Sequence, residues 1–163
     1  MFHRFLLAID ETTAGELGVS FTSALARESG ASVHVFHANE FLPGGRGLTV
    51  ETHEEAAHVV DGAVDQLRAA GVEASGECSL ANCFTLAPRI ADAAALTGAD
   101  VIVMGSHRHG RFVRLFGRGI RGRVTRITPL PVLTAPAPLK LGRRGPEAEF
   151  RRLAQDVGST LGA

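Results

Sequence analysis

The chain has 163 residues, which is enough for one domain with a sizeable hydrophobic core. Hydrophobic residues make up 45% of it and charged residues 21%, and this near-average composition excludes wholesale disorder. No apolar run reaches the ~18 residues that a membrane-spanning helix needs, and the apolar stretch at the N-terminus is too short for a signal peptide. We therefore expect a cytoplasmic protein with no membrane partner, and its two cysteines fit that compartment.

Short runs of apolar and β-branched residues predict four strands, and an alternation of apolar with polar residues predicts a fifth at an edge of the sheet. The runs at 5–9 and 101–104 contain no polar residue, which is typical of central parallel strands buried on both faces. The predicted strands cover residues 5–9, 32–37, 72–79, 101–104 and 131–134.

Helical patterns separate these strands. Two helices open with a capping box, Thr13 with Glu16 and Thr52 with Glu55. A third covers about 85–97, and a fourth starts after Gly119. The side chains expected to face inward are Leu17, Phe21, Ala24 and Leu25 in the first helix, Val59, Val60, Ala63, Val64 and Leu67 in the second, and Ile120, Val124 and Ile127 in the fourth.

Strict alternation of strands and helices predicts the α/β class. We expect a single doubly wound five-stranded parallel sheet, with strand order 3-2-1-4-5 and helices on both faces. This domain should cover residues 1–135, with a Pro/Gly-rich loop at 39–48. Residues 136–163 read as a linker and a C-terminal tail that could form a short helix after Pro146.

The ends of two predicted strands carry candidate binding residues. Asp10 ends the first strand, and Gly105 ends the fourth. In the expected strand order these two strands are neighbours, so both residues would flank the crevice where strand order reverses and ligands bind. An aspartate there can accept hydrogen bonds from a sugar, and a glycine lets a phosphate approach backbone N–H groups. Asp10 could equally be a helix cap or a turn residue.

Three stretches together resemble the universal stress protein family over residues 3–135. They are Ala8-Ile9-Asp10, the segment Val101-Ile102-Val103-Met104-Gly105-Ser106-His107, and Val124-Thr125-Arg126 followed after four residues by Pro131-Val132-Leu133. The resemblance implies the doubly wound fold and a homodimer. Many members of the family bind ATP through a G-x2-G-x9-G-[ST] loop, whereas others lack that loop and do not bind ATP.

This sequence departs from the family's ATP loop. Gly105 occupies the first glycine position, but Arg108 and Arg118 stand at the second and third, and Gly119 stands at the Ser/Thr position. The resemblance therefore predicts a degraded phosphate cradle, and ATP becomes a doubtful ligand. By resemblance, the residues that would meet a nucleotide are Asp10, Ala38, Met104, Gly105, His107, Arg108, Arg118 and Gly119.

Charge is unevenly distributed along the chain. Positions 1–100 hold five arginines and fourteen acidic residues, whereas positions 101–163 hold twelve basic and three acidic residues. The basic segment could bind an anion or a second copy of the chain, or its charge could be neutralised within one fold. We do not expect nucleic-acid binding, because the aromatic residues among the arginines are two phenylalanines, Phe112 and Phe116, that we expect in the core rather than free to stack on bases. The arginines concerned are Arg108, Arg111, Arg114, Arg118, Arg121, Arg123 and Arg126.

The preferred hypothesis is a non-enzymatic stress-response module with a degraded ATP-binding loop. The alternative is a nucleotide-binding universal stress protein that uses Arg108 and Arg118 as phosphate ligands. We predict no metal site, because the spacings of the seven histidines do not place pairs of them on one face. A homodimer should form through the last strand, which would be an open edge of the sheet. That strand is Pro131, Val132, Leu133 and Thr134.

Overall fold

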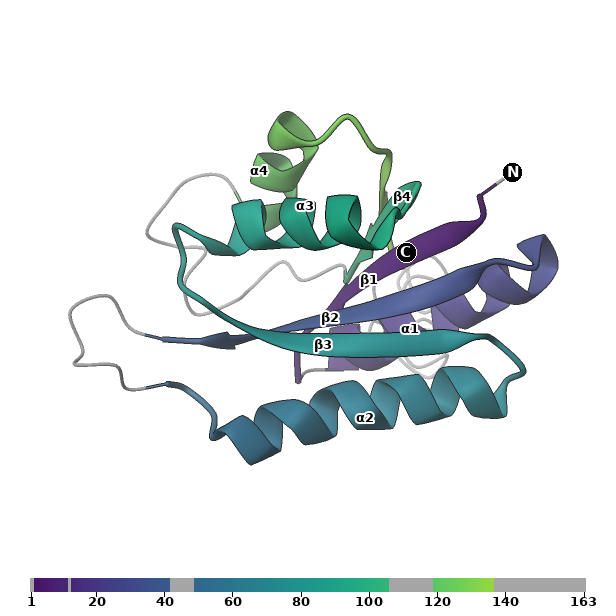
Figure 1. Cartoon of the computed structure of the whole chain (residues 1–163), viewed down its shortest axis with the longest axis horizontal. Coiled ribbons are helices and arrows are strands. Elements are labelled where there is room, and N and C mark those ends of the chain that lie inside the picture. Colours follow the sequence, from purple (N-terminus) through teal and green to yellow (C-terminus); the bar gives the residue numbers. More distant parts are fainter. Residues whose placement is uncertain (1, 12, 42–48, 106–118, 137–163) are drawn as a thin grey trace, which may run out of the picture.

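The computed structural model describes residues 2–11, 13–41, 49–105 and 119–136, in which strands and helices alternate (Figure 1). The predicted tail with its helix after Pro146 lies outside the described residues. No helix within those ranges is long and apolar enough to cross a membrane. The elements are β1 (Arg4–Ile9), α1 (Thr13–Ser29), β2 (Ser32–Glu40), α2 (His53–Ala69), β3 (Ala74–Ala81), α3 (Leu86–Thr97), β4 (Val101–Met104), α4 (Ile120–Ile127) and β5 (Val132–Thr134).

The strands form one sheet in the order β3-β2-β1-β4-β5, as predicted. Every pairing is parallel, and Leu7 of β1 lies between Val35 of β2 and Val103 of β4. The chain moves outward from β1 through β2 to β3, and then crosses to β4 on the other side of β1. Strand order therefore reverses between β1 and β4, so their carboxyl ends adjoin.

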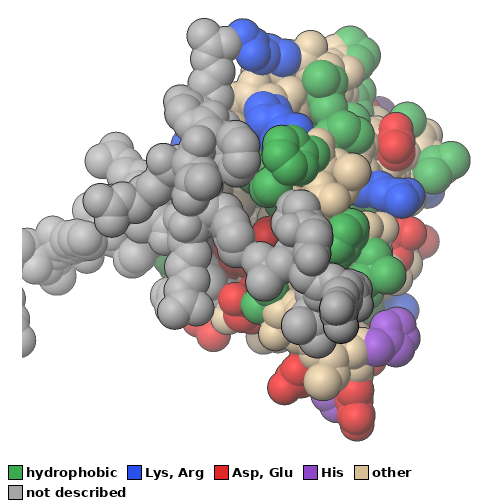
Figure 2. Space-filling model, turned by 90° about the vertical axis from the view of Figure 1, so that its left-hand side faces the viewer, with side chains coloured by type: hydrophobic (Ala, Val, Ile, Leu, Met, Phe, Trp, Pro, Cys, Tyr) green, Lys and Arg blue, Asp and Glu red, His purple; other side chains and the backbone are tan. Residues whose placement is uncertain are grey.

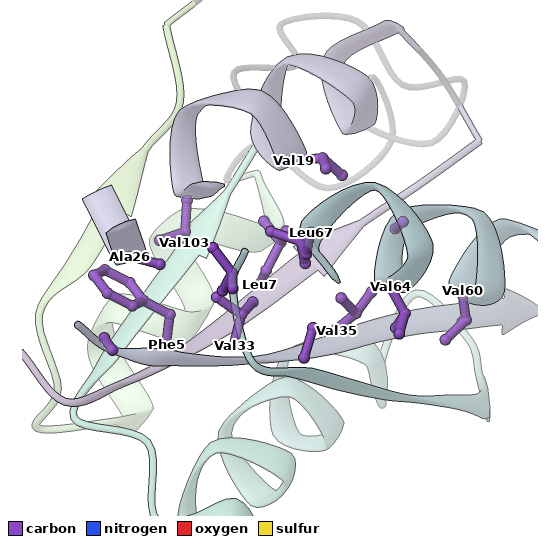
Figure 3. Packing of buried hydrophobic residues seen from close by; sticks show 14 of the residues in the cluster. Phe5, Leu7, Val19, Ala26, Val33, Val35, Val60, Val64, Leu67 and Val103 are labelled. Carbon is purple, nitrogen blue, oxygen red and sulfur yellow. The ribbon is translucent and has the colours of Figure 1, made fainter. Parts of the chain in front are cut away.

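Two hydrophobic clusters cover opposite faces of the sheet. Helices α1 and α2 pack on one face, and α3 and α4 pack on the other (Figure 1). Because side chains alternate along a strand, Leu7 and Val103 enter the first cluster, whereas Leu6 and Ile102 enter the second. All four are fully buried, as expected for central parallel strands. Figure 3 shows the first cluster, with Phe5, Leu7, Val33, Val35 and Val103 of the strands against Val19, Ala26, Val60, Val64 and Leu67 of the helices.

The predicted capping box of α2 is confirmed. The Thr52 hydroxyl accepts a hydrogen bond from the Glu55 N–H at 3.2 Å, and the Glu55 carboxylate accepts one from the Thr52 N–H at 2.8 Å. Gly71 and Gly98 follow α2 and α3 with φ of 81° and 67°, a backbone conformation that favours glycine. The expected capping box at Thr13 involves a side chain outside the described set.

Two predicted inward-facing side chains point outward instead. Ala24 is exposed, because the buried stripe of α1 runs through Val19, Thr22 and Ala26. A hydrophobicity pattern misses this stripe since one of its members is a threonine. In α4, Ile127 is 51% exposed and lies at the last position of the helix, while Leu130 packs against the core beyond it.

The predicted loop at 39–48 begins too early. Asn39 and Glu40 still belong to β2, because β3 continues far enough to pair with both, opposite Leu80 and Ala81. The predicted edge strand is confirmed as β3, but its burial does not alternate regularly, and its start is shifted. Val72 belongs to the turn after α2, where its N–H donates to the Leu67 carbonyl at 3.0 Å.

The close approach of α2 to β3 depends on Gly76. A Cβ atom there would lie 2.5 Å from Cγ1 of Val60 and 3.2 Å from Cβ of Val35. We expect Gly76→Ala to lower the free energy of unfolding by about 1–3 kcal/mol through overpacking. Gly62 is the matched control, because a Cβ atom there meets open space within α2. Gly62→Ala should raise stability by about 0.5–1 kcal/mol.

Urea denaturation of both variants measures these changes. If Gly76→Ala and Gly62→Ala shift the unfolding midpoint in the same direction, the packing of α2 on β3 differs from the one described.

Candidate functional site

The carboxyl ends of the central strands form one edge of the sheet. Ala8 of β1 pairs with Phe36 of β2 and with Met104 of β4, and Met104 pairs in turn with Thr134 of β5. The predicted site residues Asp10, Ala38 and Gly105 lie one or two positions beyond this row, and all three are partly exposed. The prediction that Asp10 and Gly105 end adjacent parallel strands is therefore confirmed.

Helix α1 starts directly against the end of β1. A Cβ atom on Gly15 would collide with the backbone carbonyl oxygen of Asp10, so only glycine permits this approach. The contact fixes the backbone at Asp10, where a ligand at the switch point would bind. A glycine in the first turn of a predicted helix is the signal for this contact in the sequence, and it was not among the predicted site residues.

Helix α4 begins at the same edge. Its N-cap is Gly119, with φ −55° and ψ 157°, and no side chain caps the helix. Among the described residues, none has an atom within 4 Å of where a Cβ atom at Gly119 would lie. The first turn is held near the end of β5, because the Arg121 guanidinium donates to the Thr134 hydroxyl at 2.8 Å. Gly119 therefore has both the backbone conformation and the space for the Ser or Thr of the family loop.

Arg123 joins α4 to the loop between β3 and α3. Its guanidinium donates to the backbone carbonyl of Cys83 and, at 2.6 Å, to that of Phe84. The guanidinium of Arg123 is therefore hydrogen-bonded within the protein, whereas Arg126 of the same helix is exposed. The predicted arginine-rich face along 108–118 lies outside the described residues.

A buried histidine bridges two segments beside Asp10. His37 is 2% exposed, with Nδ1 3.1 Å from the Ile9 carbonyl oxygen and Nε2 2.8 Å from Oε2 of Glu51. Both ring nitrogens thus face oxygen atoms, and the ring joins the end of β1 to the segment before α2. Asn39 fixes the same segment by donating to the Glu51 backbone carbonyl at 3.0 Å. The histidine spacings considered for a metal site do not reveal this bridge, because Glu51 lies beyond the loop.

Acidic side chains crowd this part of the edge. Burial raises the pKa of the Glu40 carboxyl, and the nearby carboxylates of Glu11 and Asp10 raise it further, while His37 acts in the opposite direction. Figure 2 looks onto this edge, and most of the visible Asp and Glu side chains lie in its lower half, whereas arginine side chains lie at the top, on the side of α4, and on the right. Of the twelve basic residues at positions 101–163, only Arg121, Arg123 and Arg126 lie within the described ranges.

Other predicted site residues are placed as follows. Met104 is 9% exposed and packs in the core of the α3–α4 face, so its side chain contributes little surface to the crevice. His107, Arg108 and Arg118 lie outside the described residues. Within the described ranges, no three His, Cys, Asp or Glu side chains come together as metal ligands would.

The raised pKa of Glu40 predicts a pH-dependent effect on stability. The folded chain holds a proton on Glu40 more tightly than the unfolded chain, so stability falls as pH rises from the ordinary value of 4.5 through the folded-state pKa. Glu40→Gln removes this loss, and we expect it to raise the free energy of unfolding at neutral pH but not below pH 4.5.

Glu55→Gln is the control, because it should change the free energy of unfolding at neutral pH in the opposite direction. Hydrogen bonds from Thr52 lower the pKa of Glu55, so its ionised form supports the fold above the ordinary value, and that support is lost as pH falls through the folded-state pKa. This variant should be slightly less stable at neutral pH. Urea denaturation of both variants at several pH values measures these changes. If Glu40→Gln changes the free energy of unfolding by the same amount at every pH, the prediction is contradicted.

Comparisons with known proteins give a consistent answer. The pattern that describes the universal stress protein family matches residues 1–136. A comparison with curated protein sequences found no match. Among solved structures, a universal stress protein from Archaeoglobus fulgidus is 24% identical with a TM-score of 0.64, and the alignment covers 83% of this chain and 95% of that one.

Two further solved structures contain nucleotides. The universal stress protein from Archaeoglobus fulgidus in complex with dAMP is 24% identical, with a TM-score of 0.61 and coverage of 82% of this chain and 98% of that one. A universal stress protein family protein from Arabidopsis thaliana with AMP bound is 12% identical, with a TM-score of 0.59 and coverage of 89% and 98%. At these identities the structures show a shared fold. Because the family pattern spans every described strand and helix, this chain belongs to the universal stress protein family.

Proposed function

We propose that this protein is a non-enzymatic stress-response module of the cytoplasm whose crevice binds the nucleoside end of an adenine nucleotide weakly. The observation that carries the proposal is the arrangement of Asp10, Gly105 and Gly119 at one edge of the sheet. Asp10 can accept from a ribose hydroxyl or an exocyclic amine, and Gly105 leaves room for the ligand to approach the backbone. The dAMP and AMP in structures of the same fold support this ligand class.

The phosphate side of the crevice supports weak rather than tight binding. Gly119 offers no hydroxyl at the start of α4, and the second and third glycine positions of the family loop hold Arg108 and Arg118. The carboxylates near Glu40 make the neighbouring edge unfavourable for a polyphosphate. A monophosphate places less charge there than a triphosphate does.

A second candidate function is ATP binding through arginine. One observation favours it, since Arg121 shows that an arginine side chain at the start of α4 reaches the carboxyl end of β5. Guanidinium groups of Arg108 and Arg118 could clamp phosphates bidentately and replace the missing backbone amides. The two candidate functions predict opposite effects on ATP binding when the family loop is restored.

We expect the natural protein to bind ATP weakly or not at all, and the triple variant Arg108→Gly, Arg118→Gly, Gly119→Ser to gain binding. The glycines would let backbone N–H groups reach the phosphates, and the serine would supply the missing hydroxyl. Gly119→Ser alone should be tolerated and should stabilise α4 by about 0.3 kcal/mol as a better N-cap. Titration calorimetry with ATP and with AMP measures the affinities.

Asp10→Ala in the triple variant is the control, and it should reduce the gain if the nucleotide occupies the crevice. Tight ATP binding by the natural protein that the triple variant abolishes would contradict the preferred function and establish the arginine site.

We also propose a homodimer that pairs β5 with its copy. In the described part of the chain, no strand pairs with the outer side of β5. The carbonyl of Pro131 accepts from Ile102, and the Ala135 N–H donates to Met104, so odd-numbered residues face β4. The N–H groups of Val132 and Thr134 therefore point to the open side, where a second copy could pair with them.

Val132→Pro tests this dimer, because it removes an outward N–H and leaves the pairing with β4 intact. We expect light scattering to show a dimer for the natural protein and for Val132→Thr, which keeps the N–H, but a monomer for Val132→Pro. A natural protein that is monomeric at micromolar concentration, or a Val132→Pro variant that stays dimeric, contradicts the proposal.

A further inference from the structure

The face of the sheet beneath α3 carries a group of polar side chains away from the crevice. The hydrophobic cluster on this face draws on β1, β2, β4 and β5 together with α3 and α4, but on no residue of β3. On this face of β3, Ser75 and Glu77 are exposed and Ser79 is half-buried, whereas Ala81 at the end of the strand is fully buried. His34 of β2 lies opposite Ser75 in the register of the sheet, so their side chains share this face.

Ser75, His34 and Glu77 lie in a chain of contacts. Nδ1 of His34 is 2.9 Å from Oγ of Ser75, and Nε2 of His34 is 3.7 Å from Oε1 of Glu77. Nε2 is buried, and within the described ranges it has no hydrogen-bond partner. The Glu77 carboxylate faces it, which favours the ring hydrogen on Nε2 and leaves Nδ1 to accept the Ser75 proton. This is the order of roles in which a histidine activates a serine hydroxyl.

The backbone beside Ser75 offers a donor as well. Val33 donates its N–H to the Glu73 carbonyl, so the odd residues of β3 direct their backbone groups toward β2. The N–H of Gly76, the residue after Ser75, points instead to the open edge of the sheet. It can donate to an oxygen that becomes negative next to the Ser75 hydroxyl.

From these observations we propose that Ser75 is a nucleophilic serine that takes an acyl group from small activated esters. The Ser75 oxygen forms a bond to the acyl carbon, the bond between that carbon and the leaving aryl oxide breaks, and the hydroxyl proton passes to Nδ1 of His34 and then to water. Acylation and deacylation both pass through an oxyanion, and a single N–H donor stabilises it less than the donors of most acyl-transfer enzymes do. The aryl oxide leaves easily from the activated ester, whereas the Ser75 oxygen is a poor leaving group, so the acyl group stays on Ser75 and the reaction ends after one equivalent.

Mass spectrometry after incubation of the full chain with p-nitrophenyl acetate tests the proposal. We expect one acetyl group on Ser75, at least about tenfold less of it in His34→Gln, since general-base help is worth that or more, and none in Ser75→Ala. Glu77→Gln should give an intermediate amount, because it weakens the preference for the reactive tautomer.

Ser79→Ala is the matched control, because Ser79 lies on the same face of β3, four residues further along. The Ser79→Ala variant should be acetylated at Ser75 to the same extent as the natural protein. Circular dichroism and a urea midpoint establish that His34→Gln is folded. Equal acetylation of Ser75 and Ser79 in the natural protein, acetylation of Ser75 that is unchanged in folded His34→Gln, or no acetylation of Ser75 would each overturn the proposal.

Discussion

The position of the crevice depends on the burial of β1 and β4 on both faces of the sheet. Leu6, Leu7, Ile102 and Val103 are fully buried, as strands at the centre of a sheet covered on both faces require. With β1 and β4 paired at the centre, β2 and β3 lie on one side and β5 on the other, so strand order reverses between β1 and β4. Packing therefore decides where Asp10 and Gly105 meet, before any ligand is involved.

What surrounds that crevice differs on its two sides. Carboxylates gather beyond β1 and β2, where the pKa of Glu40 is raised, whereas Arg121 of α4 lies at the end of β5. In the family loop, the Ser or Thr at the start of α4 would contact phosphate, but here that position is Gly119. The first turn of α4 is held instead by Arg121 on Thr134, and its second by Arg123 on the carbonyls of Cys83 and Phe84. These bonds hold the helix in place without a phosphate.

The sequence was sufficient to predict those parts of the fold that depend on local pattern. Uniformly apolar runs identified β1 and β4, and the Thr52 capping box located α2, because each signal lies within a few residues. The end of β2 and the buried Thr22 of α1 were not predictable in this way, since they depend on how far β3 extends and on which side of α1 meets the sheet. The pairs His37–Glu51 and His34–Ser75 join residues separated by 14 and 41 positions, and neither spacing is a motif.

These two histidines show how position in the sheet decides what an imidazole can do. They are three residues apart on β2 and therefore face opposite sides. His37 lies on the side of α1 and α2, where it is buried. Its two ring nitrogens contact the Ile9 carbonyl oxygen and the Glu51 carboxylate, so it holds the segment before α2 against the end of β1. His34 lies on the side of α3 and α4, whose hydrophobic cluster does not include β3, and its neighbour Ser75 stays open to solvent. A helix that extended over β3 would bury Ser75 and leave both histidines structural; the narrower layer formed by α3 and α4 is what leaves Ser75 open to reagents.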